Sequence, residues 1–459
     1  MPSSRGRNGL ERNLDLSEPA PGQASTREGL ATMFRHRRVL LASLIGTAVE
    51  FYDFYIYATA ASLVFGPLFF PASSPIAQLM AAYASFALAF LARPLGAAVF
   101  GHYGDRIGRK STLVASLMLM GGSTVLIALL PTYAMVGWVA PLLLCILRFG
   151  QGFGLGGEWG GAALLAVENA PPGWRARFGM MPQLGAPIGF IAANGLFLLL
   201  GLWLSDADFI AWGWRIPFLA SGLLIALGLW ARLKISETPE FRAALAKEPP
   251  AAIPIAELFT KHARETIAGT LAVITCFALF YITTAFALGY ATTNLGMPRE
   301  MVLKIQLGAI LMLALGIVLA GWLSDRRSAG LMLTAGCAAT VPLGFVFGVG
   351  FNAQAPELLF LVLAVSLLLM GFAYGPLGEW LTALFPPRVR YSGASFAFNV
   401  GGIIGGALAP IVAQALVAEW GIGAVGLYLT CAAVLSLIGL LGLADSDRPA
   451  DGERKEGFG

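Results

Sequence analysis

Long runs of apolar residues, separated by short polar turns, occupy most of the chain. A helix needs about 20 residues to cross the apolar part of a bilayer, and each run is long enough to do so. The pattern predicts an all-α membrane protein with twelve transmembrane helices. Their expected spans are 39–66, 76–100, 111–130, 138–165, 178–204, 212–233, 266–290, 302–323, 330–350, 357–383, 391–417 and 421–443.

One long polar insertion, at 234–264, falls between the sixth and the seventh predicted helix. It divides the membrane part into an N-terminal six-helix bundle (39–233) and a C-terminal six-helix bundle (265–444). Polar tails at 1–38 and 445–459 flank the two bundles. Because an even number of helices separates them, the insertion and both tails are expected on one side of the membrane.

Short motifs recur in the two halves in the same order. The matching pairs are GxxxDR at 101–106 and 321–326, GEW at 157–159 and 378–380, and a PP…RxR pattern at 171–177 and 386–390. Three matches in one order indicate two parallel repeats, related by an axis along the membrane normal. In such folds the binding site lies between the repeats, near the middle of the membrane.

Composition and charge agree with this class and give it an orientation. Hydrophobic residues make up 57% of the chain and charged residues 12%, with a mean hydropathy of +0.74, whereas soluble domains carry about 25% charged residues. Of the loop lysines and arginines, only Arg215, Arg299 and Lys304 fall on the side opposite the tails. Positive residues collect on the cytoplasmic side, so both termini are expected there. The four cysteines lie in apolar runs, and neither disulfides nor a zinc site is predicted.

The charged segment GHYGDRIGRK, at 101–110, lies between the second and the third predicted helix. It resembles the loop signature of the major facilitator superfamily of transporters at Gly101, Asp105, Arg106, Gly108, Arg109 and Lys110. The resemblance implies a tight cytoplasmic loop that takes part in gating. A loop that only fixes the membrane topology is the alternative.

We predict that this loop acts as a latch on the cytoplasmic side. Asp105 would interact with the N-terminal end of the helix that follows Arg390, because a helix N-terminus attracts negative charge. Arg106 or Arg109 would pair with Glu168 at the inner end of the fourth helix. Such contacts would close the inner side and would break when substrate is released.

A second gating loop is expected in the C-terminal half. Asp325 and Arg326 keep part of the superfamily pattern there. The sequence SDRRSAG departs from the rest of it, so this second loop is expected to be looser than the first.

Ionisable residues inside membrane helices are costly, and they are functional candidates for that reason. At a rise of 1.5 Å per residue, Asp53 and Arg148 lie about 21 and 25 Å from the inner ends of their helices and can meet near the midplane. Arg93 and Glu158 each fall about 10 Å above the inner ends and form a second candidate pair. For both pairs, an ion pair that only fixes helix packing is the alternative. The full set is Glu50, Asp53, Arg93, Arg148, Glu158 and Glu379.

Several segments resemble one branch of the superfamily, the metabolite:proton symporters, which holds shikimate, 2-oxoglutarate, citrate and proline/betaine permeases. They are ExxDFYxY in the first helix, RFGQGFGLGGEWGGAALLAVENAPP in the fourth, WGWRIPFL at the start of the sixth, ETPEF after it and LFPPRVRYSG before the eleventh. GEWGGAALL and AWGWRIPFL are most similar to the shikimate-type permeases. The resemblance implies a secondary transporter of a bacterial cytoplasmic (inner) membrane that needs no cofactor.

The residues also bear on proton coupling. All three histidines lie in predicted loops, so the proton carrier must be a carboxylate. We predict Asp53 as carrier, with Glu50 and Glu158 as further candidates. Arg148 would bind the substrate carboxylate, and an anionic substrate that competes for it would free Asp53 to take up a proton. Further substrate-binding candidates, each with a packing role as the alternative, are Tyr52, Gln151, Gln183, Tyr281, Tyr374, Glu379 and Asn399.

The sequence thus predicts proton-coupled import of a small polar metabolite, such as shikimate or a related organic acid, by alternating access. The transporter is expected to act as a monomer in the lipid bilayer. An efflux carrier that exchanges its substrate for protons, and a symporter of a zwitterion such as betaine or proline, are the alternatives. No nucleophile with its base, metal cluster or Walker loop is recognisable, so an enzyme, a metal site, ATP-driven transport and nucleic-acid binding are not predicted.

Overall fold

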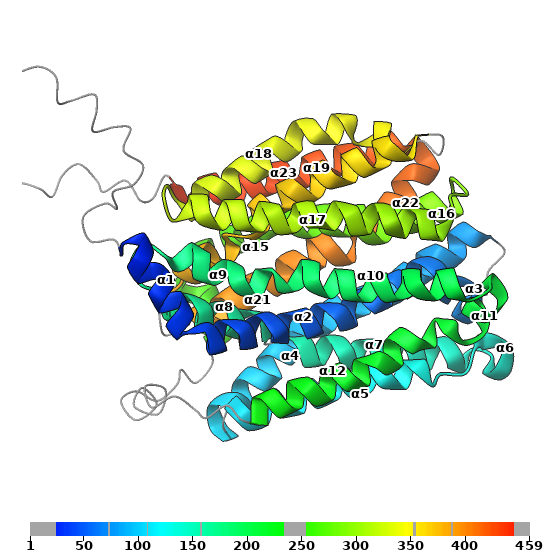
Figure 1. The fold of residues 1–459 in the computed structure, drawn as a ribbon, viewed down its shortest axis with the longest axis horizontal. Helices are drawn as coiled ribbons and strands as arrows, with labels where there is room; N and C mark the ends of the chain where they lie inside the picture. The colour runs from blue at the N-terminus through cyan, green and yellow to red at the C-terminus, as the bar shows by residue number, and fades with distance from the viewer. Residues whose placement is uncertain are drawn as a thin grey trace, which may run out of the picture.

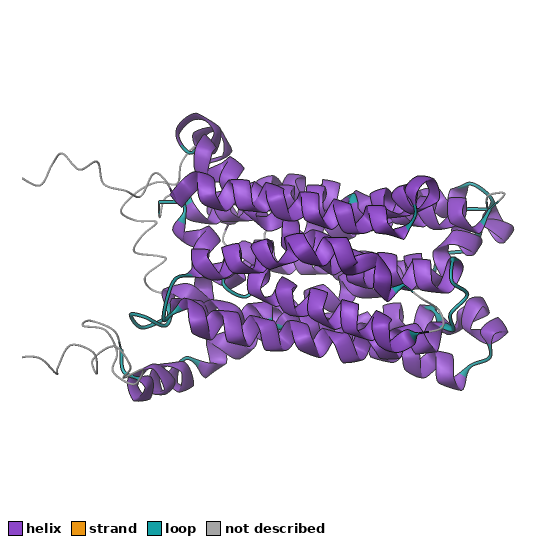
Figure 2. Ribbon diagram, turned by 90° about the horizontal axis from the view of Figure 1, so that it is seen from above, coloured by secondary structure: helices purple, strands orange, loops and turns teal. Residues whose placement is uncertain are grey.

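The computed structural model describes residues 24–71, 74–107, 109–156, 158–233, 254–351, 355–386 and 389–444, without the side chains of 101–113, 230–233, 254–256 and 444. Long helices run side by side along one axis of the molecule (Figures 1 and 2). The short helix α1 (Thr26–Arg35) and the last residues of α23 (Ile422–Ala444) lie at the same end of the bundle (Figure 1). We call this the tail end, and the opposite end the far end.

The N-terminal half supplies the first six membrane helices. In order they are α2 (Arg37–Ala60) with η2 (Ala61–Phe65) and α3 (Gly66–Phe69); α4 (Pro75–Ile107); α5 (Arg109–Ala128); α7 (Val139–Leu155) with α8 (Glu158–Glu168); α9 (Arg175–Gln183) with α10 (Gly185–Trp203); and α12 (Arg215–Leu233). Three short helices lie at the far end (Figure 1): α6 (Tyr133–Val136), α11 (Asp206–Asp208) and η3 (Phe209–Gly213).

The C-terminal half repeats this plan after the short helix α14 (Pro254–Lys261). Its helices are α15 (Ala263–Tyr281) with η4 (Ile282–Phe286) and α16 (Ala287–Thr293); α17 (Arg299–Ser324); α18 (Ala329–Val346) with η5 (Phe347–Gly350); α19 (Pro356–Tyr374) with α20 (Leu377–Ala383); α21 (Arg390–Gly402) with η6 (Ile403–Ala407) and α22 (Ala409–Trp420); and α23.

Each of the twelve predicted membrane helices corresponds to one of these helical stretches. Ten are long and apolar enough to cross a membrane. The sixth is a bent pair, Asp206–Gly213 and Arg215–Leu229, with 44° between its parts. The third, α5, has a shorter apolar part, Val114–Ala128. The predicted fold class is therefore confirmed, with helix ends within a few residues of the expected positions except for α4, which continues to Ile107.

Interruptions of the helices recur at corresponding places in the two halves. The first helix contains the π-helical segment η2, and its counterpart in the second half contains η4. These two segments touch where Ser62 Oγ donates to the carbonyl oxygen of Ala285, at 3.1 Å. The fourth helix is likewise interrupted between α7 and α8, and its counterpart between α19 and α20. The interruptions therefore follow the same repeat as the sequence motifs.

The segment 101–110 differs from its predicted form. Helix α4 continues to Ile107 and α5 begins at Arg109, so most of the expected loop is helical. The side chains of Asp105, Arg106 and Arg109, the surroundings of Gly101, and the whole of Gly108 lie outside what the structure describes. The predicted latch at Asp105 therefore stays a prediction.

Close packing of α4 against α7 makes specific demands on glycine. A Cβ atom at Gly96 would overlap the carbonyl oxygen of Phe153, whereas one at Gly122 would meet nothing within 4 Å. Backbone cannot yield as a flexible side chain can, and overpacking a core costs about 1–3 kcal/mol. We expect Gly96→Ala to lower the unfolding temperature of the purified protein and Gly122→Ala to leave it unchanged. Equal unfolding temperatures would show that the two helices can move apart at no cost.

Candidate functional site

A buried carboxylate occupies the middle of α2. Asp53 is only 1% exposed. Its Oδ1 accepts a hydrogen bond from Ser221 Oγ of α12 at 2.5 Å, and its Oδ2 accepts one from Thr124 Oγ1 of α5 at 3.3 Å. A carboxylate in an apolar helix bundle is stable only when its oxygens have such partners. Both hydroxyl residues look like ordinary packing residues in the sequence, and the fold alone identifies them as ligands of Asp53.

Arg148, on α7, is completely buried in the same half. Its guanidinium lies over the rings of Phe54, Tyr57 and Phe86, with the central carbon 4.0 to 4.8 Å from the ring centroids. Nη1 donates to Gln151 Oε1 at 2.9 Å, but Nε and Nη2 have no hydrogen-bond partner. These two atoms form one edge of the guanidinium, which is the edge that binds a carboxylate through two parallel hydrogen bonds.

Asp53 and Arg148 do not form the direct ion pair that helix arithmetic suggested. Two side chains connect them instead: Gln151 Nε2 donates to Thr124 Oγ1 at 2.6 Å, and Thr124 donates onward to Asp53. Counting residues along helices estimates depth in the membrane, but it does not give the rotation of each helix. The two charged groups therefore share one hydrogen-bond network without touching.

The second predicted pair, Arg93 with Glu158, is also not among the salt bridges of the described residues. Glu158 Oε1 accepts a hydrogen bond from Ser116 Oγ at 2.7 Å. The Arg93 guanidinium lies 4.4 Å from the ring centroid of Phe54, and its electrostatic neighbours include Glu50. Its Nε atom is buried without a hydrogen-bond partner. Arg93 therefore belongs with Glu50 and the aromatic residues of the central region, and not with Glu158.

A small cavity lies between the halves at the centre of the bundle. Its volume is about 10 Å³, room for about one water molecule. Its polar lining comes from both halves and includes Thr59, Asn194 and Gln306. Gln306 Nε2 is held by the carbonyls of Thr283 and Thr284, whereas its Oε1 is buried and unpartnered. The structure is therefore closed around its centre, and a molecule larger than water can enter only when the halves separate.

Two further predicted substrate-binding residues, Tyr52 and Tyr281, lie in the packed interior of the bundle. The Tyr52 hydroxyl donates to the Pro217 carbonyl at 2.8 Å, inside the N-terminal half. Tyr281 packs among aromatic rings, with its centroid 5.3 Å from that of Phe86 and 5.4 Å from that of Phe90. Tyr281 thus lies beside the aromatic residues that surround Arg148.

Gln183, Tyr374 and Asn399 take part in contacts between the halves, toward the tail end. Gln183 accepts from Trp159 Nε1 at 3.1 Å and donates to the Tyr374 carbonyl at 3.2 Å. Asn399 Nδ2 donates to the Gly156 carbonyl, at the interruption of the fourth helix. The Trp159 ring stacks on that of Phe398 from the other half, with 3.8 Å between centroids and 2° between planes. These side chains close the path from the centre to the tail end. Counting residues along the helices did not predict that they would lie in this closure.

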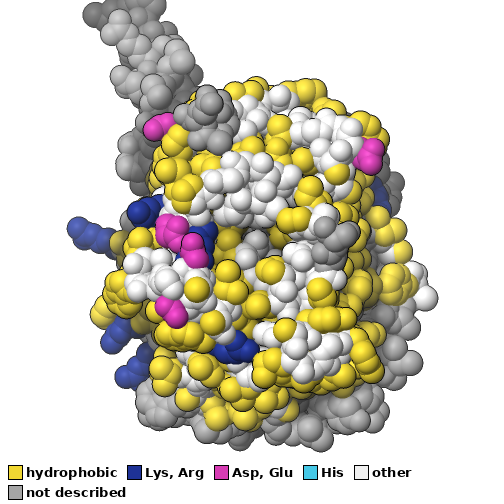
Figure 3. Space-filling view, turned by 90° about the vertical axis from the view of Figure 1, so that its right-hand side faces the viewer, with side chains coloured by type: hydrophobic (Ala, Val, Ile, Leu, Met, Phe, Trp, Pro, Cys, Tyr) yellow, Lys and Arg dark blue, Asp and Glu magenta, His cyan; other side chains and the backbone are white. Residues whose placement is uncertain are grey.

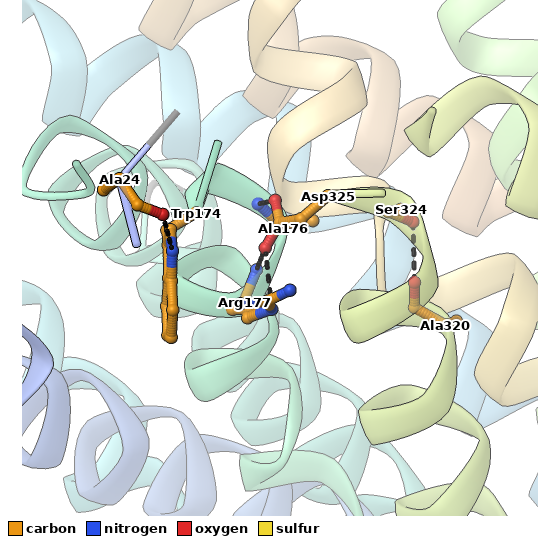
Figure 4. A network of polar contacts seen from close by, with 7 residues as sticks. All are labelled: Ala24, Trp174, Ala176, Arg177, Ala320, Ser324 and Asp325. Atoms are coloured by element: carbon orange, nitrogen blue, oxygen red, sulfur yellow. Dashed lines mark hydrogen bonds and ion pairs between the residues drawn. The ribbon is translucent and has the colours of Figure 1, made fainter. Parts of the chain in front are cut away.

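The second gating loop forms a tight contact and is not loose, as the departure of SDRRSAG from the pattern had suggested. Asp325 accepts hydrogen bonds from the backbone N–H groups of Ala176 and Arg177, at 2.9 and 3.1 Å (Figure 4). It also pairs with the Arg177 side chain at 3.2 Å. Asp325 thus caps the N-terminus of α9 in the other half, where the helix dipole favours a negative charge. The contact depends on Asp325, so the altered residues after it do not loosen the loop.

We call the contact of Asp325 with the N-terminus of α9 the Asp325 latch. A second cavity, of about 120 Å³, lies near it at the interface of the halves. It is lined by Glu168 and Arg175 of the N-terminal half and by Glu379 and Arg390 of the C-terminal half. Glu379 therefore lies toward the tail end and away from the centre, and its Oε2 atom is buried without a partner. Arg326, in the turn after α17, has its guanidinium 3.6 Å from the ring centroid of Trp322, in the last turn of that helix.

The far end is closed by a different group of charges. Arg299, at the start of α17, pairs with Asp206 of the other half at 2.9 Å and with its neighbour Glu300 at 2.6 Å. Figure 3 views this end, where apolar and uncharged groups dominate and acidic side chains gather beside basic ones at one edge. Tyr83 adds a hydrogen bond between the halves, to the carbonyl of Ala285 at 2.8 Å. Both ends are therefore closed in this structure.

The fold of this chain matches that of solved transporter structures. The D-xylose-proton symporter shares the fold with a TM-score of 0.68 at 19% identity, over 88% of this chain and 97% of that one. A structure of the major facilitator superfamily proton:xylose symporter XylE has a TM-score of 0.67 at 18% identity, over 90% and 96%. Residues 39–253 match the family described as sugar (and other) transporter.

Closer relatives decide the family. The chain is 50% identical to the inner membrane metabolite transport protein YhjE of Escherichia coli (strain K12), over 88% of this chain and 93% of that protein. It is a metabolite transporter of the major facilitator superfamily. The shikimate transporter of the same organism is 38% identical, over 92% and 97%. The proline/betaine transporter of Salmonella typhimurium is 30% identical, over 91% and 85%. The family resemblance seen in the sequence is confirmed. The prediction that the protein is a transporter and not an enzyme is also confirmed.

The latch of this transporter allows a test with a defined pH dependence. Burial raises the pKa of Asp325 from 3.8 to about 6, and the two backbone hydrogen bonds and Arg177 only partly offset it. A group with a raised pKa in the closed state favours closure at low pH, and this preference is lost as pH rises through about 6. We expect spin labels at Asn169→Cys and Leu331→Cys to report more closed molecules at pH 5 than at pH 7.5.

Asp325→Asn should remove this pH dependence, because the amide does not titrate in that range. Asp208→Asn is the matched control, since that carboxylate is exposed at the far end. Label distances in Asp325→Asn that follow those of the unaltered latch at both pH values would contradict the gating role.

Proposed function

We propose that this transporter imports a small carboxylated metabolite together with a proton, as a monomer of the bacterial inner membrane. One observation carries the proposal. The only described hydrogen bond of the buried Arg148 side chain is its Nη1 bond to Gln151, and the carboxylate-binding edge formed by Nε and Nη2 has no partner. A completely buried cation with an unused hydrogen-bonding edge is costly in an apolar bundle. A substrate carboxylate would satisfy that edge with two hydrogen bonds.

Coupling to a proton follows from the network that joins Arg148 to Asp53. A substrate anion adds a second negative charge to a network that already holds the Asp53 carboxylate. Two negative charges close together in an apolar site cost more than one, and a proton on Asp53 removes the excess. Substrate and proton would then favour each other's binding. This thermodynamic linkage is what a symporter requires.

The assignment of an inner and an outer gate depends on the orientation of the protein in the membrane. The tail end carries most of the loop lysines and arginines, so we place it in the cytoplasm by the positive-inside bias. The closure formed by Trp159, Phe398 and the Asp325 latch is then the inner gate. The Asp206–Arg299 pair belongs to the outer gate. Substrate would enter when the outer contacts break and leave when the inner ones do.

The test is uptake by the purified transporter in liposomes with an imposed proton gradient, acidic outside. Shikimate, quinate, aromatic acids, di- and tricarboxylates, betaine and proline would be offered as radiolabelled compounds. We expect a carboxylate to accumulate, and accumulation to collapse when a protonophore is added. Unchanged accumulation under a protonophore, with any sodium gradient also removed, would overturn proton coupling.

The same screen separates the two alternatives. Aromatic rings around Arg148 are also suitable for a quaternary ammonium group, and a relative transports proline and betaine. Accumulation of betaine but of no simple carboxylate would favour zwitterion symport. Loss of preloaded substrate in exchange for protons, without uptake under the same gradient, would favour an efflux carrier.

A further inference from the structure

The short helix α1 lies across the tail end of the bundle, directly before the first membrane helix (Figure 1). Ser25 caps its N-terminus: Glu28 N donates to Ser25 Oγ at 3.3 Å, and Ser25 N donates to Glu28 Oε2 at 2.9 Å. This reciprocal capping fixes the start of the helix. Only His36 separates α1 from α2, so α1 is held at the level where the membrane span begins.

One side of α1 packs against the start of the fifth membrane helix. Gly29 is buried there, and a Cβ atom at this position would overlap the Trp174 ring. Met33, one turn later, packs against the cluster that contains Leu40, Trp174 and Phe178. Ala24 adds a backbone hydrogen bond to the Pro172 carbonyl and accepts one from Trp174 Nε1 (Figure 4).

The neighbouring side of α1 is apolar and mostly exposed among the described residues, and the Arg37 guanidinium lies over the Phe34 ring, 4.1 Å from its centroid. Leu30 and Phe34, four residues apart and therefore adjacent on the helix surface, are 55% and 67% exposed. Leu41 and Ile45 on α2 are also exposed apolar residues that follow them along the chain. The basic residues of this region, all exposed, are Arg27, Arg35, Arg37 and Arg38.

An anionic lipid surface fits this side better than any other occupant. A helix with apolar residues on one side and arginines beside them lies in the membrane interface, and its binding increases with anionic lipid. The position of α1 at the end of a membrane span places Leu30 and Phe34 at that depth. Each arginine near an anionic membrane surface contributes about 1 kcal/mol, equivalent to about fivefold in affinity.

The packed side of α1 connects this lipid contact to the inner gate. Trp174, which α1 covers, lies under the guanidinium of Arg177 at 4.2 Å from its ring centroid. Arg177 in turn pairs with Asp325 of the other half (Figure 4). The chain of contacts α1, Trp174, Arg177 and Asp325 therefore runs from the membrane surface to the latch.

We infer that α1 binds anionic phospholipid through Leu30, Phe34 and the arginines beside them, and thereby holds Trp174 and Arg177 in position to close the inner gate. The inference does not depend on which substrate is transported or on proton coupling. It predicts that anionic lipid increases the closed population of the latch. It also predicts that this effect requires both sides of α1.

The experiment uses the full-length transporter in nanodiscs of phosphatidylcholine, with or without phosphatidylglycerol. Spin labels at Asn169→Cys and Leu331→Cys measure latch closure, in a background where Cys145 and Cys431 are alanine. A dye at Ala31→Cys, in separate samples, measures insertion of α1 into the interface. We expect phosphatidylglycerol to increase the closed population severalfold and to shift the dye emission to the blue.

Three variants separate the binding of lipid by α1 from the effect of α1 on the latch. Leu30→Ser with Phe34→Ser, and Arg27→Gln with Arg35→Gln, should lose both effects of phosphatidylglycerol without a change in unfolding temperature, because all four side chains are exposed. Gly29→Val should keep the dye response but lose the effect on the latch, because its side chain displaces α1 from Trp174.

Lys261→Gln, an exposed charge on α14, is the control and should behave as the unaltered protein. A latch that does not respond to phosphatidylglycerol, or that responds equally in all variants, would overturn the inference.

Discussion

Arg148→Lys is expected to weaken substrate binding by about 10- to 100-fold while the protein folds normally. Lysine keeps the charge but is a point donor without the planar edge formed by Nε and Nη2. Hydrogen bonds to charged groups contribute about 1.5–3 kcal/mol each, and losing the two-point contact accounts for a change of this size. The lysine also loses the stacked contact of the guanidinium with Phe54 and Tyr57.

The measurement is equilibrium binding of the accumulated substrate to the purified protein, with unfolding temperature as the check on folding. Arg215→Lys is the matched control, because this arginine donates to the carbonyls of Ala128 and Leu130 at the far end, away from the centre. It should leave affinity unchanged. Affinity in Arg148→Lys equal to that of the unaltered transporter would show that Arg148 serves packing only.

Asp53→Asn is expected to abolish accumulation against a gradient and to leave exchange intact. The amide has nearly the same shape and can keep a hydrogen bond with Ser221 or Thr124, but it cannot bind and release a proton in the physiological pH range. The variant should therefore bind substrate at all pH values with little pH dependence. Proton-driven uptake should fall at least about tenfold, since the variant lacks the coupling carboxylate.

Two assays on the same liposomes give the answer. Uptake under a proton gradient measures coupling, and counterflow of labelled substrate into preloaded liposomes measures the conformational cycle alone. Ser221→Ala is the control, because it removes one hydrogen bond to Asp53 but keeps the titratable group. It should retain accumulation. Full proton-driven uptake by Asp53→Asn would show that another carboxylate couples transport to the proton, with Glu50 and Glu158 as the candidates.

Glu50 would act in a different group of charges from Asp53. It is an electrostatic neighbour of Arg93, whose guanidinium lies on the ring of Phe54. The same ring is 4.2 Å from the guanidinium carbon of Arg148. Two arginines thus share one aromatic side chain at the centre, each with an acidic residue in its own network. A substrate with two carboxylates could use both, and the uptake screen includes such compounds for that reason.

The sequence by itself determined the class of protein, the number and order of its helices and its repeat. Apolar runs of about 20 residues form membrane-spanning helices, because in lipid the hydrogen bonds of every backbone group must be satisfied within the helix. It also singled out Asp53 and Arg148, since charge inside an apolar run is rare enough to be noticed without any structure. Hydroxyl and amide residues such as Thr124 and Asn194 carry no such signal, because they also occur in ordinary helix packing.

Only the tertiary structure decided which of these residues meet. Depth along a helix follows from counting, but partners depend on rotation about the helix axis and on where each helix is interrupted. The structure thereby replaced a direct Asp53–Arg148 pair with a network through Gln151 and Thr124. In the structure, Gln183 and Asn399 lie in the closure between the halves, and Asp325 caps the start of α9. Contacts between halves of a chain depend on geometry that no local pattern of residues contains.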